Sequence, residues 1–272
     1  LAVARFNLAL VYIRQERPRL ALEQLDELIE LDQTDPRGYL LRARLRFEAK
    51  QLDPAASDLN RALELDPENY QAWQFRGRVH YQRQQYAAAV KAFEAVLERN
   101  PSLVEAFFDL ALSQQASGQA QEAIKSYQKF LLAFPDDFQA HYLLGLAYRD
   151  DSQGDLALEQ LQIAERIDPS HEELSQELGN LLLDRGNLEE AQMRLLRADP
   201  ESAANLGNLG IIAKRQGEIT GNIKLAQCYL VAVFRVLGVE QCRSLWQLVH
   251  SVVQNLLGAR RISVNGQSNA RI

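Results

Sequence analysis

The residues best suited to catalysis or metal binding are few and widely spaced. The histidines and cysteines are His80, His141, His171, Cys228, Cys242 and His250. Zinc sites in proteins need such ligands at close spacings, as in CxxC pairs. The two cysteines stand fourteen residues apart, and we expect them to pack as small hydrophobic side chains. The sequence therefore predicts no metal site.

Neighbouring carboxylates are the next candidates, because paired acids can carry out general acid–base catalysis. Asp136-Asp137 and Asp150-Asp151 are such pairs, but both stand at expected helix boundaries, where helix capping explains them. The sequence contains no phosphate-binding glycine loop and no GxSxG motif. We predict no catalytic residues, no cofactor and no enzymatic activity for this chain.

Arginines are the remaining residues that could bind a charged ligand. Residues 38–50 are rich in arginine, and Arg76 and Arg78 follow, so contacts to nucleic-acid phosphates have to be considered. The net charge is −6, however, and the aromatic residues do not interleave with the basic ones as in a base-stacking surface. No nucleic acid is expected as a partner.

Charge varies along the chain. It is −3 for residues 1–35, +3 for 36–103, −12 for 104–202 and +6 for 203–272. The basic C-terminal part could dock on the acidic repeats or attract anionic lipid, and we favour docking.

The amino-acid composition indicates which secondary structure positions these side chains. The 272 residues are 47% hydrophobic and 24% charged, with only 14 glycines and 8 prolines, which is typical of an all-α protein. No run reaches the roughly 18 apolar residues of a membrane span, and Arg5 and Asn7 interrupt the apolar start that a signal peptide would need. The compartment stays open, with the cytoplasm favoured over the periplasm or a membrane surface. Residue 1 already follows a helical pattern, so the chain could be a fragment of a longer protein.

Small and large residues recur in register every 34 residues. Alanine stands at Ala21, Ala55, Ala89, Ala123, Ala157 and Ala191. Twelve residues before each is a small residue: Ala9, Ala43, Gly77, Ala111, Gly145 and Gly179. Four residues after each is a large apolar one: Leu25, Leu59, Phe93, Tyr127, Leu161 and Leu195. In the middle four repeats a proline follows twelve residues after the alanine: Pro67, Pro101, Pro135 and Pro169.

This register predicts antiparallel helix pairs that cross where side chains are small, with the large residue filling the space beside the crossing. Ser117-Gly118, Gly154-Asp155 and Gly186-Asn187 are expected to turn the chain from the first helix of a pair to the second. In the second repeat we expect Asp53 to cap the second helix and Pro54 to occupy its first position. Stacked pairs share one continuous core.

A 34-residue helix–turn–helix unit with these columns resembles the tetratricopeptide repeat family. The resemblance covers residues 1–202 as six repeats and implies a right-handed α-solenoid. Residues 203–238 are expected to form a degenerate seventh repeat, 239–258 an amphipathic capping helix and 259–272 a flexible tail. Arg42 and Arg76 replace the leucine that four repeats have at this position, so these repeats pack differently or carry function.

The resemblance also implies a binding surface, because first helices in this family line a concave groove that receives a peptide or helix of a partner. The groove residues would be Arg37, Leu40, Arg44, Gln71, Gln74, Arg78, Tyr81, Phe108, Asp109, Leu112, Gln139, Tyr142 and Arg149. Arginines bind carboxylates through paired hydrogen bonds, and Tyr81, Phe108 and Tyr142 would offer flat apolar anchors. The alternative is that the arginines only keep the protein soluble.

One subclass of the family clamps the C-terminal carboxylate of Hsp90-type chaperones with lysine and asparagine on first helices. The corresponding positions here are Phe6/Leu10, Leu40/Arg44, Gln74/Arg78 and Phe108/Leu112. No carboxylate clamp of that type is expected, and the groove favours segments that mix acidic with apolar residues.

The leading functional hypothesis is a non-catalytic protein-interaction scaffold or adaptor. One alternative is an accessory domain of a larger enzyme of the glycosyl- or sulfotransferase type. Another is an assembly factor of an envelope or secretion machine, held at a membrane by the C-terminal helix.

Overall fold

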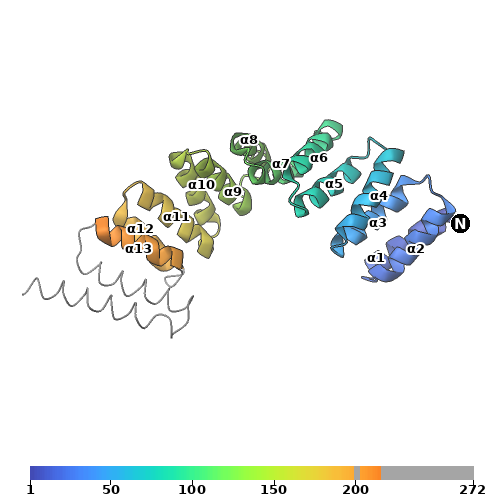
Figure 1. The fold of residues 1–272 in the computed structure, drawn as a ribbon, viewed down its shortest axis with the longest axis horizontal. Helices are drawn as coiled ribbons and strands as arrows, with labels where there is room; N and C mark the ends of the chain where they lie inside the picture. Colours follow the sequence, from blue (N-terminus) through green and yellow to red (C-terminus); the bar gives the residue numbers. More distant parts are fainter. Residues whose placement is uncertain (199–202, 216–272) are drawn as a thin grey trace, which may run out of the picture. The chain divides into compact units, whose positions relative to one another are not determined.

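The computed structural model describes residues 1–198 and 203–215, and every regular element in these ranges is an α-helix (Figure 1). The helices are α1 (Ala2–Arg14), α2 (Pro18–Leu31), α3 (Pro36–Glu48), α4 (Leu52–Leu65), α5 (Tyr70–Gln82), α6 (Tyr86–Arg99), α7 (Glu105–Ala116), α8 (Ala120–Leu131), α9 (Phe138–Asp150), α10 (Gly154–Ile167), α11 (Glu172–Asp184), α12 (Leu188–Arg197) and α13 (Ala203–Arg215). The predicted all-α fold of repeated helix pairs is confirmed.

Two compact units divide the chain, residues 1–160 and residues 161–272. In the first unit α1 pairs with α2, α3 with α4, α5 with α6 and α7 with α8, and each second helix also packs on the next first helix. In the second unit α11 pairs with α12, and α13 packs on both. Within each unit, neighbouring helices therefore share their core, as in a solenoid.

Small residues mark the crossing of each helix pair, as predicted. Ala21, Ala55, Ala89, Ala123, Ala157 and Ala191 all have fully buried side chains, with 0% of their surface exposed. At Gly77 a Cβ atom would lie 2.7 Å from the Phe93 ring, and at Gly179 it would lie 2.8 Å from Leu195. The large residue thus occupies the volume that a side chain at the small position would need.

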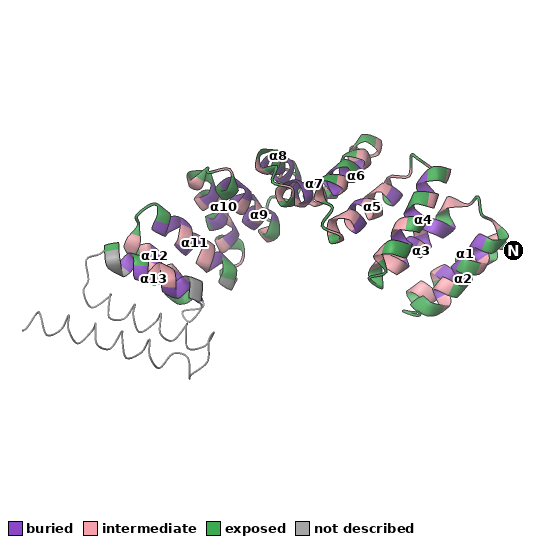
Figure 2. Ribbon diagram, viewed as in Figure 1, coloured by how far each residue is buried: buried purple, intermediate pink, exposed green. Residues whose placement is uncertain are grey.

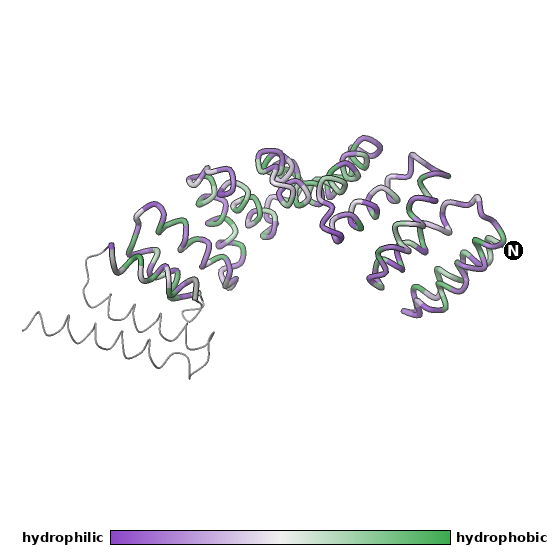
Figure 3. The backbone as a smooth tube through the Cα atoms, in the orientation of Figure 1, coloured by the Kyte–Doolittle hydropathy of each residue, from purple (hydrophilic) through white to green (hydrophobic). Residues whose placement is uncertain are grey.

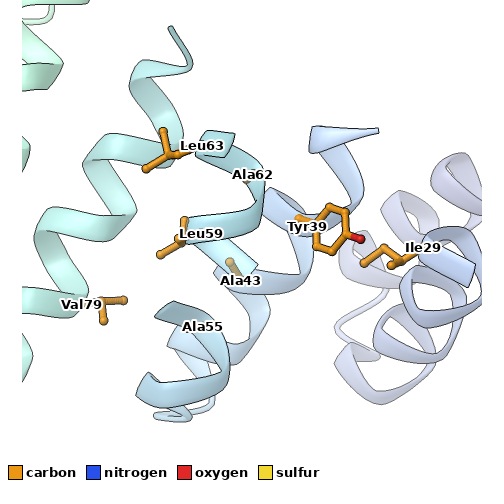
Figure 4. Close-up of a cluster of buried hydrophobic side chains, with 9 residues drawn as sticks. Ile29, Tyr39, Ala43, Ala55, Leu59, Ala62, Leu63 and Val79 are labelled. Atoms are coloured by element: carbon orange, nitrogen blue, oxygen red, sulfur yellow. The ribbon is translucent and has the colours of Figure 1, made fainter. Parts of the chain in front are cut away.

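Apolar faces of neighbouring helices meet in clusters of buried side chains within the first unit. In Figure 2 the buried residues lie between paired helices, and in Figure 3 hydrophobic and hydrophilic residues alternate along each helix. Figure 4 shows one cluster, in which Ile29, Ala43, Leu59 and Val79 come from α2, α3, α4 and α5. One cluster therefore joins the second helix of the first repeat to the first helix of the third.

A residue with left-handed backbone ends the first helix of each repeat. Positive φ angles occur at Glu16, Lys50, Gln84, Gly118, Ser152 and Gly186, which are 34 residues apart. The N–H of the following residue donates to a carbonyl five residues back, as from Gln119 to Gln114 (2.9 Å) and from Gln85 to His80 (2.9 Å). This is the Schellman arrangement, which satisfies carbonyls left free at a helix end.

Two predictions about helix boundaries were wrong. α4 begins at Leu52 after Gln51, so Asp53 lies inside the first turn and instead forms an ion pair with Arg83. Pro54 is tolerated there because the first four N–H groups of a helix have no partner within it. The turn before α10 is made by Ser152, with φ of 61°, and Gly154 is already helical.

The predicted ends of three second helices are confirmed, since α4, α6 and α10 each end two residues before Pro67, Pro101 and Pro169. The fourth, α8, ends earlier, at Leu131, four residues before Pro135. Asp137 caps α9 by accepting from Ala140 N–H (2.7 Å), as predicted for this acid pair. The expected seventh repeat lies within the described residues only up to Arg215, and the capping helix and tail lie outside them.

We predict that glycine is favoured at both of two equivalent left-handed positions, so that removing it from one and introducing it at the other change stability in opposite directions. Gly118→Ala should lower the free energy of unfolding by about 1 kcal/mol, because a Cβ atom is disfavoured at positive φ. Gln84→Gly should raise it by up to about 1 kcal/mol, since the strain of a side chain there is removed. Urea denaturation followed by circular dichroism would measure both, and a shift of the two midpoints in the same direction would contradict this prediction.

We also predict that Gly77 and Phe93 are coupled. Gly77→Ala should cost about 1–3 kcal/mol because the new methyl group overlaps the ring. In that background Phe93→Leu should recover most of the loss, since the second repeat pairs Ala43 with Leu59 at these positions. A double-mutant cycle that includes Phe93→Leu alone measures the coupling free energy between the two positions. Additive losses would contradict the prediction, because they would mean that the ring is not what makes Gly77→Ala unfavourable.

Candidate partner-binding groove

The first helices carry all the predicted groove residues. We call this set the first-helix groove: α3 carries Arg37, Leu40 and Arg44; α5 carries Gln71, Gln74, Arg78 and Tyr81; α7 carries Phe108, Asp109 and Leu112; α9 carries Gln139, Tyr142 and Arg149. Contacts join α3 to α5 and α5 to α7 directly. The structure thus brings the groove residues of the second, third and fourth repeats onto adjacent helices.

Arg78 and Asp109 are held together across α5 and α7. Arg78 Nε and NH2 donate to Asp109 Oδ2 at 3.2 and 3.0 Å, and the guanidinium lies over the Phe75 ring, 5.9 Å from its centroid. Both side chains keep some exposure, 42% and 22% respectively. The two predicted groove charges therefore compensate each other, and a partner carboxylate would have to compete with Asp109 for Arg78.

Arg37 is likewise engaged by its own chain. Its Nε and NH2 groups fork onto the Asp35 carboxylate, the shortest distance being 2.7 Å, and its guanidinium lies over Phe6, 5.1 Å from the ring centroid. The hydrogen bond from Arg37 lowers the pKa of Asp35, which also accepts from the Arg37 backbone N–H at 2.9 Å as the cap of α3. Asp35 stays ionised and holds Arg37 at the start of the helix.

Arg44 differs from these two arginines. Its Nε is buried and makes no hydrogen bond, although the side chain as a whole is 36% exposed. The carboxylate paired with it, that of Glu48, lies 3.7 Å away, beyond hydrogen-bond distance. An arginine Nε–H without an acceptor is a donor that a bound group could satisfy.

The predicted aromatic anchors differ in exposure. Tyr81 is partly exposed and contacts Tyr86 edge-on, with centroids 5.4 Å apart, and burial raises the pKa of its hydroxyl. Phe108 is half-buried against Tyr127 and Phe130. Tyr142 has only 8% of its surface exposed and stacks on Phe138, so its ring belongs to the core instead of presenting an open face.

The remaining members are mostly polar. Gln71 and Gln139 are exposed, Leu40, Gln74 and Leu112 are half-buried, and Arg149 pairs with Asp150 at 3.0 Å.

Sequence reasoning missed a buried ionic network, which explains why arginine replaces leucine at position 42. Arg42 forks onto Asp58 (2.7 and 3.0 Å) and donates to Asp26 (2.7 Å), and Arg46 donates to Asp58 (2.8 Å). Asp58 has only 3% of its surface exposed. Burial disfavours the charged guanidinium, but the hydrogen bonds to Asp58 and Asp26 outweigh it and raise the pKa of Arg42. Of the two interpretations, different packing accounts for Arg42.

Arg76 also has a packing role. Its guanidinium and that of Arg99 lie over the Trp73 ring, each 5.1 Å from the centroid. Trp73 Nε1 and Arg99 Nε both donate to the Pro67 carbonyl at 2.9 Å. Cation–π contacts of this kind stabilise by about 0.5–2 kcal/mol. One sequence signal could have distinguished Arg42 from Arg76. Arg42 has a carboxylate, Asp58, on the neighbouring second helix, and Arg76 has Ala92 at the equivalent position.

Metal clusters and membrane-spanning helices are both absent from the described residues. Across residues 1–198 and 203–215, no three histidine, cysteine or acidic side chains come close enough to hold a metal ion. In the same ranges none of the helices has the length and apolar character needed to cross a bilayer.

Comparison with known proteins agrees with the geometry. A family model described as tetratricopeptide repeat matches residues 6–67, 40–104, 108–172 and 177–232. The structure resembles YrrB, described as a TPR protein with an unusual peptide-binding site, with 24% identity and a TM-score of 0.61 over 67% of this chain and 96% of YrrB. It also resembles MamA from Desulfovibrio magneticus RS-1, with 22% identity and a TM-score of 0.59 over 62% of this chain and 96% of MamA. No curated protein sequence matches the chain. At these identities the two structures show the shared fold.

The buried network predicts a large effect of removing one partner. Arg42→Leu should lower the free energy of unfolding by about 3 kcal/mol, because Asp58 loses its forked partner while staying buried. The double variant Arg42→Leu/Asp58→Ala should be clearly more stable than the single one, since the buried Asp58 carboxylate is removed and Arg46, which loses its acceptor, is 23% exposed to water. Arg61→Gln on the exposed face of α4 is the matched control, with an expected change within about 0.5 kcal/mol. Chemical denaturation measures all three, and equal losses for Arg42→Leu and Arg61→Gln would contradict a structural role for the network.

Proposed function

Because the chain belongs to the tetratricopeptide repeat family, we propose that it is a non-catalytic scaffold or adaptor that binds a peptide or helix of a partner protein along the first-helix groove. Stacked repeats of this kind build extended binding surfaces out of side chains from successive helices. The first helices of the second to fourth repeats lie side by side here, which supports a surface that one segment can follow.

Arg44 is the single observation that carries the proposal. The Nε group is buried without a hydrogen bond, and a polar group left in that state costs about 1–3 kcal/mol. The Arg44 side chain is 36% exposed, and a carboxylate of a bound segment would satisfy the Nε–H once this side chain turns toward it, which would remove the cost. Arg37 and Arg78, by contrast, already bind Asp35 and Asp109, so they would contribute by exchanging partners.

The chemistry of the surface favours a mixed acidic and apolar segment. Arg44 and Arg78 occupy equivalent positions of consecutive repeats, 34 residues apart, and would bind carboxylates on one segment. Tyr81 and Phe108 supply partly exposed rings of the type found at binding hot spots. Neither a Hsp90-type carboxylate clamp nor a nucleic-acid surface is part of the proposal, and an internal segment of the partner fits it as well as a chain end.

We predict that Arg44→Gln weakens binding of acidic–apolar segments by about tenfold or more, since one charge-assisted hydrogen bond contributes about 1.5–3 kcal/mol. The ligands would be peptides selected from a random displayed library on the full chain, with dissociation constants measured by isothermal titration calorimetry. Lys91→Gln, an exposed change on the second helix α6, is the control and should leave the affinity unchanged.

Circular dichroism should show equal helicity for the two variants and the parent chain. Selection of basic peptides, or equal affinity of the parent chain and Arg44→Gln for every selected peptide, would contradict this proposal.

A further inference from the structure

A hollow of about 670 Å³ lies between the second helices α6 and α8, with α7 beneath it. We call it the α6–α8 hollow. Phe107, Leu110 and Gln114 of α7 line it, together with charged side chains from the two second helices. At 3.6 residues per turn these three residues lie on the side of α7 opposite to Phe108, Asp109 and Leu112. The hollow is therefore separate from the first-helix groove.

The floor of the hollow combines apolar surface with one polar pair. Leu110 is buried and Phe107 is half-buried. Ser126 Oγ donates to Gln114 Oε1 at 2.7 Å, and both side chains are buried. The floor thus offers an apolar surface next to an oriented amide and a hydroxyl oxygen.

The walls carry opposite charges. Glu94 and Glu98 stand on α6 and are exposed. In the described part of the chain no ion pair involves Glu94, and Glu98 has only a long contact of 3.7 Å to Arg99. On the α8 side Lys129 lies over the Phe107 ring, 5.0 Å from its centroid, and Lys125 and Glu122 are exposed beside it. The two α6 carboxylates have no lysine beside them on their own helix among the lining residues, whereas Glu122 shares α8 with Lys125 and Lys129, so we expect a bound cation to lie nearer α6.

The same junction two repeats earlier shows what fills such a space. Leu110, Glu94 and Ser126 are each 68 residues after Arg42, Asp26 and Asp58, so they occupy equivalent positions. There the Arg42 guanidinium runs between the second helices α2 and α4 and bonds to Asp26 and Asp58. At the α6–α8 junction the arginine is replaced by a leucine, which is too short to reach across, while a glutamate stands where Asp26 does.

We propose that the α6–α8 hollow binds an arginine side chain of a partner protein segment, in the place that Arg42 fills within its own repeat. The guanidinium would bind the Glu94 carboxylate and donate to the Ser126 hydroxyl oxygen, with its aliphatic part on Leu110 and Phe107. An acidic residue beside that arginine in the partner would meet Lys125 and Lys129. This second site does not rest on the proposed function of the first-helix groove.

A short peptide tests the site on the full chain. The probe is acetyl-Leu-Arg-Asp-amide, compared with the same peptide carrying citrulline, which has the shape of arginine without the charge. NMR titration would follow the side-chain amide of Gln114 and the methyl groups of Leu110. We expect saturable shifts at both residues with the arginine peptide, and at least about tenfold weaker binding of the citrulline peptide, the effect of one charge-assisted hydrogen bond.

Three variants distinguish binding in the α6–α8 hollow from binding elsewhere on the chain. Leu110→Arg should fill the hollow from within and abolish the shifts at Gln114, and Glu94→Gln should weaken binding by about tenfold. Glu94→Gln changes only an exposed residue, so it keeps the test valid if circular dichroism shows that Leu110→Arg does not fold. Arg44→Gln should have no effect on binding of this probe.

Several results would overturn the proposal. Equal binding of the arginine and citrulline peptides would exclude a guanidinium site. Shifts that map to α3 and α5 and vanish in Arg44→Gln would assign the probe to the first-helix groove. Shifts at Gln114 that grow with protein concentration in the absence of peptide would show that a second copy of the chain covers the hollow.

Discussion

The close crossing of two helices at a position without a large side chain is the constraint on which the rest of the structure depends. Gly77 and Gly179 leave no room for a Cβ atom beside Phe93 and Leu195, and the alanines of the second helices are completely buried. Dispersion contacts and apolar burial at this point hold each pair together. Once the pair is fixed, its two outer faces can only be buried by the next pair, so stacking follows from the crossing.

The space between successive second helices is filled differently at three places along the chain: between α2 and α4, between α4 and α6, and between α6 and α8. Arg42 fills the first with ion pairs to the buried Asp58 and the exposed Asp26. Arg76 and Arg99 close the next over the face of Trp73. Leu110 leaves the third open. The crossing fixes the backbone at all three, so the side chains there are free to differ, and of these three junctions the one at Leu110 has the hollow.

Much of the fold could be predicted from the sequence because the 34-residue register acts over short distances. The small and large columns identify helix faces, and the prolines identify the ends of second helices. The residue that turns the chain was harder to predict. Its left-handed backbone is set by the register, so Ser152 adopts it while Gly154, a better candidate by residue type, is already helical. A capping role for Asp53 failed for a similar reason, since α4 begins at Leu52, two residues before the Pro54 start that a cap at Asp53 would give.

The site was less predictable because it depends on pairings between helices. The sequence places Arg37, Arg44 and Arg78 on first helices, but it does not say that Asp35 and Asp109 engage two of them and leave the Arg44 Nε without an acceptor. The burial of Tyr142 likewise depends on neighbours that the spacing alone does not identify.

The left-handed residues, one in each of six repeats, have a consequence for how such a chain changes over evolutionary time. Each repeat leaves its first helix through the same backbone geometry, with the same hydrogen bond from the next N–H to the carbonyl five residues back. Duplication or deletion of any whole 34-residue unit therefore joins two ends that already match. The number of repeats can therefore change by recombination while every turn keeps the same backbone geometry. The side chains between repeats can change independently of this.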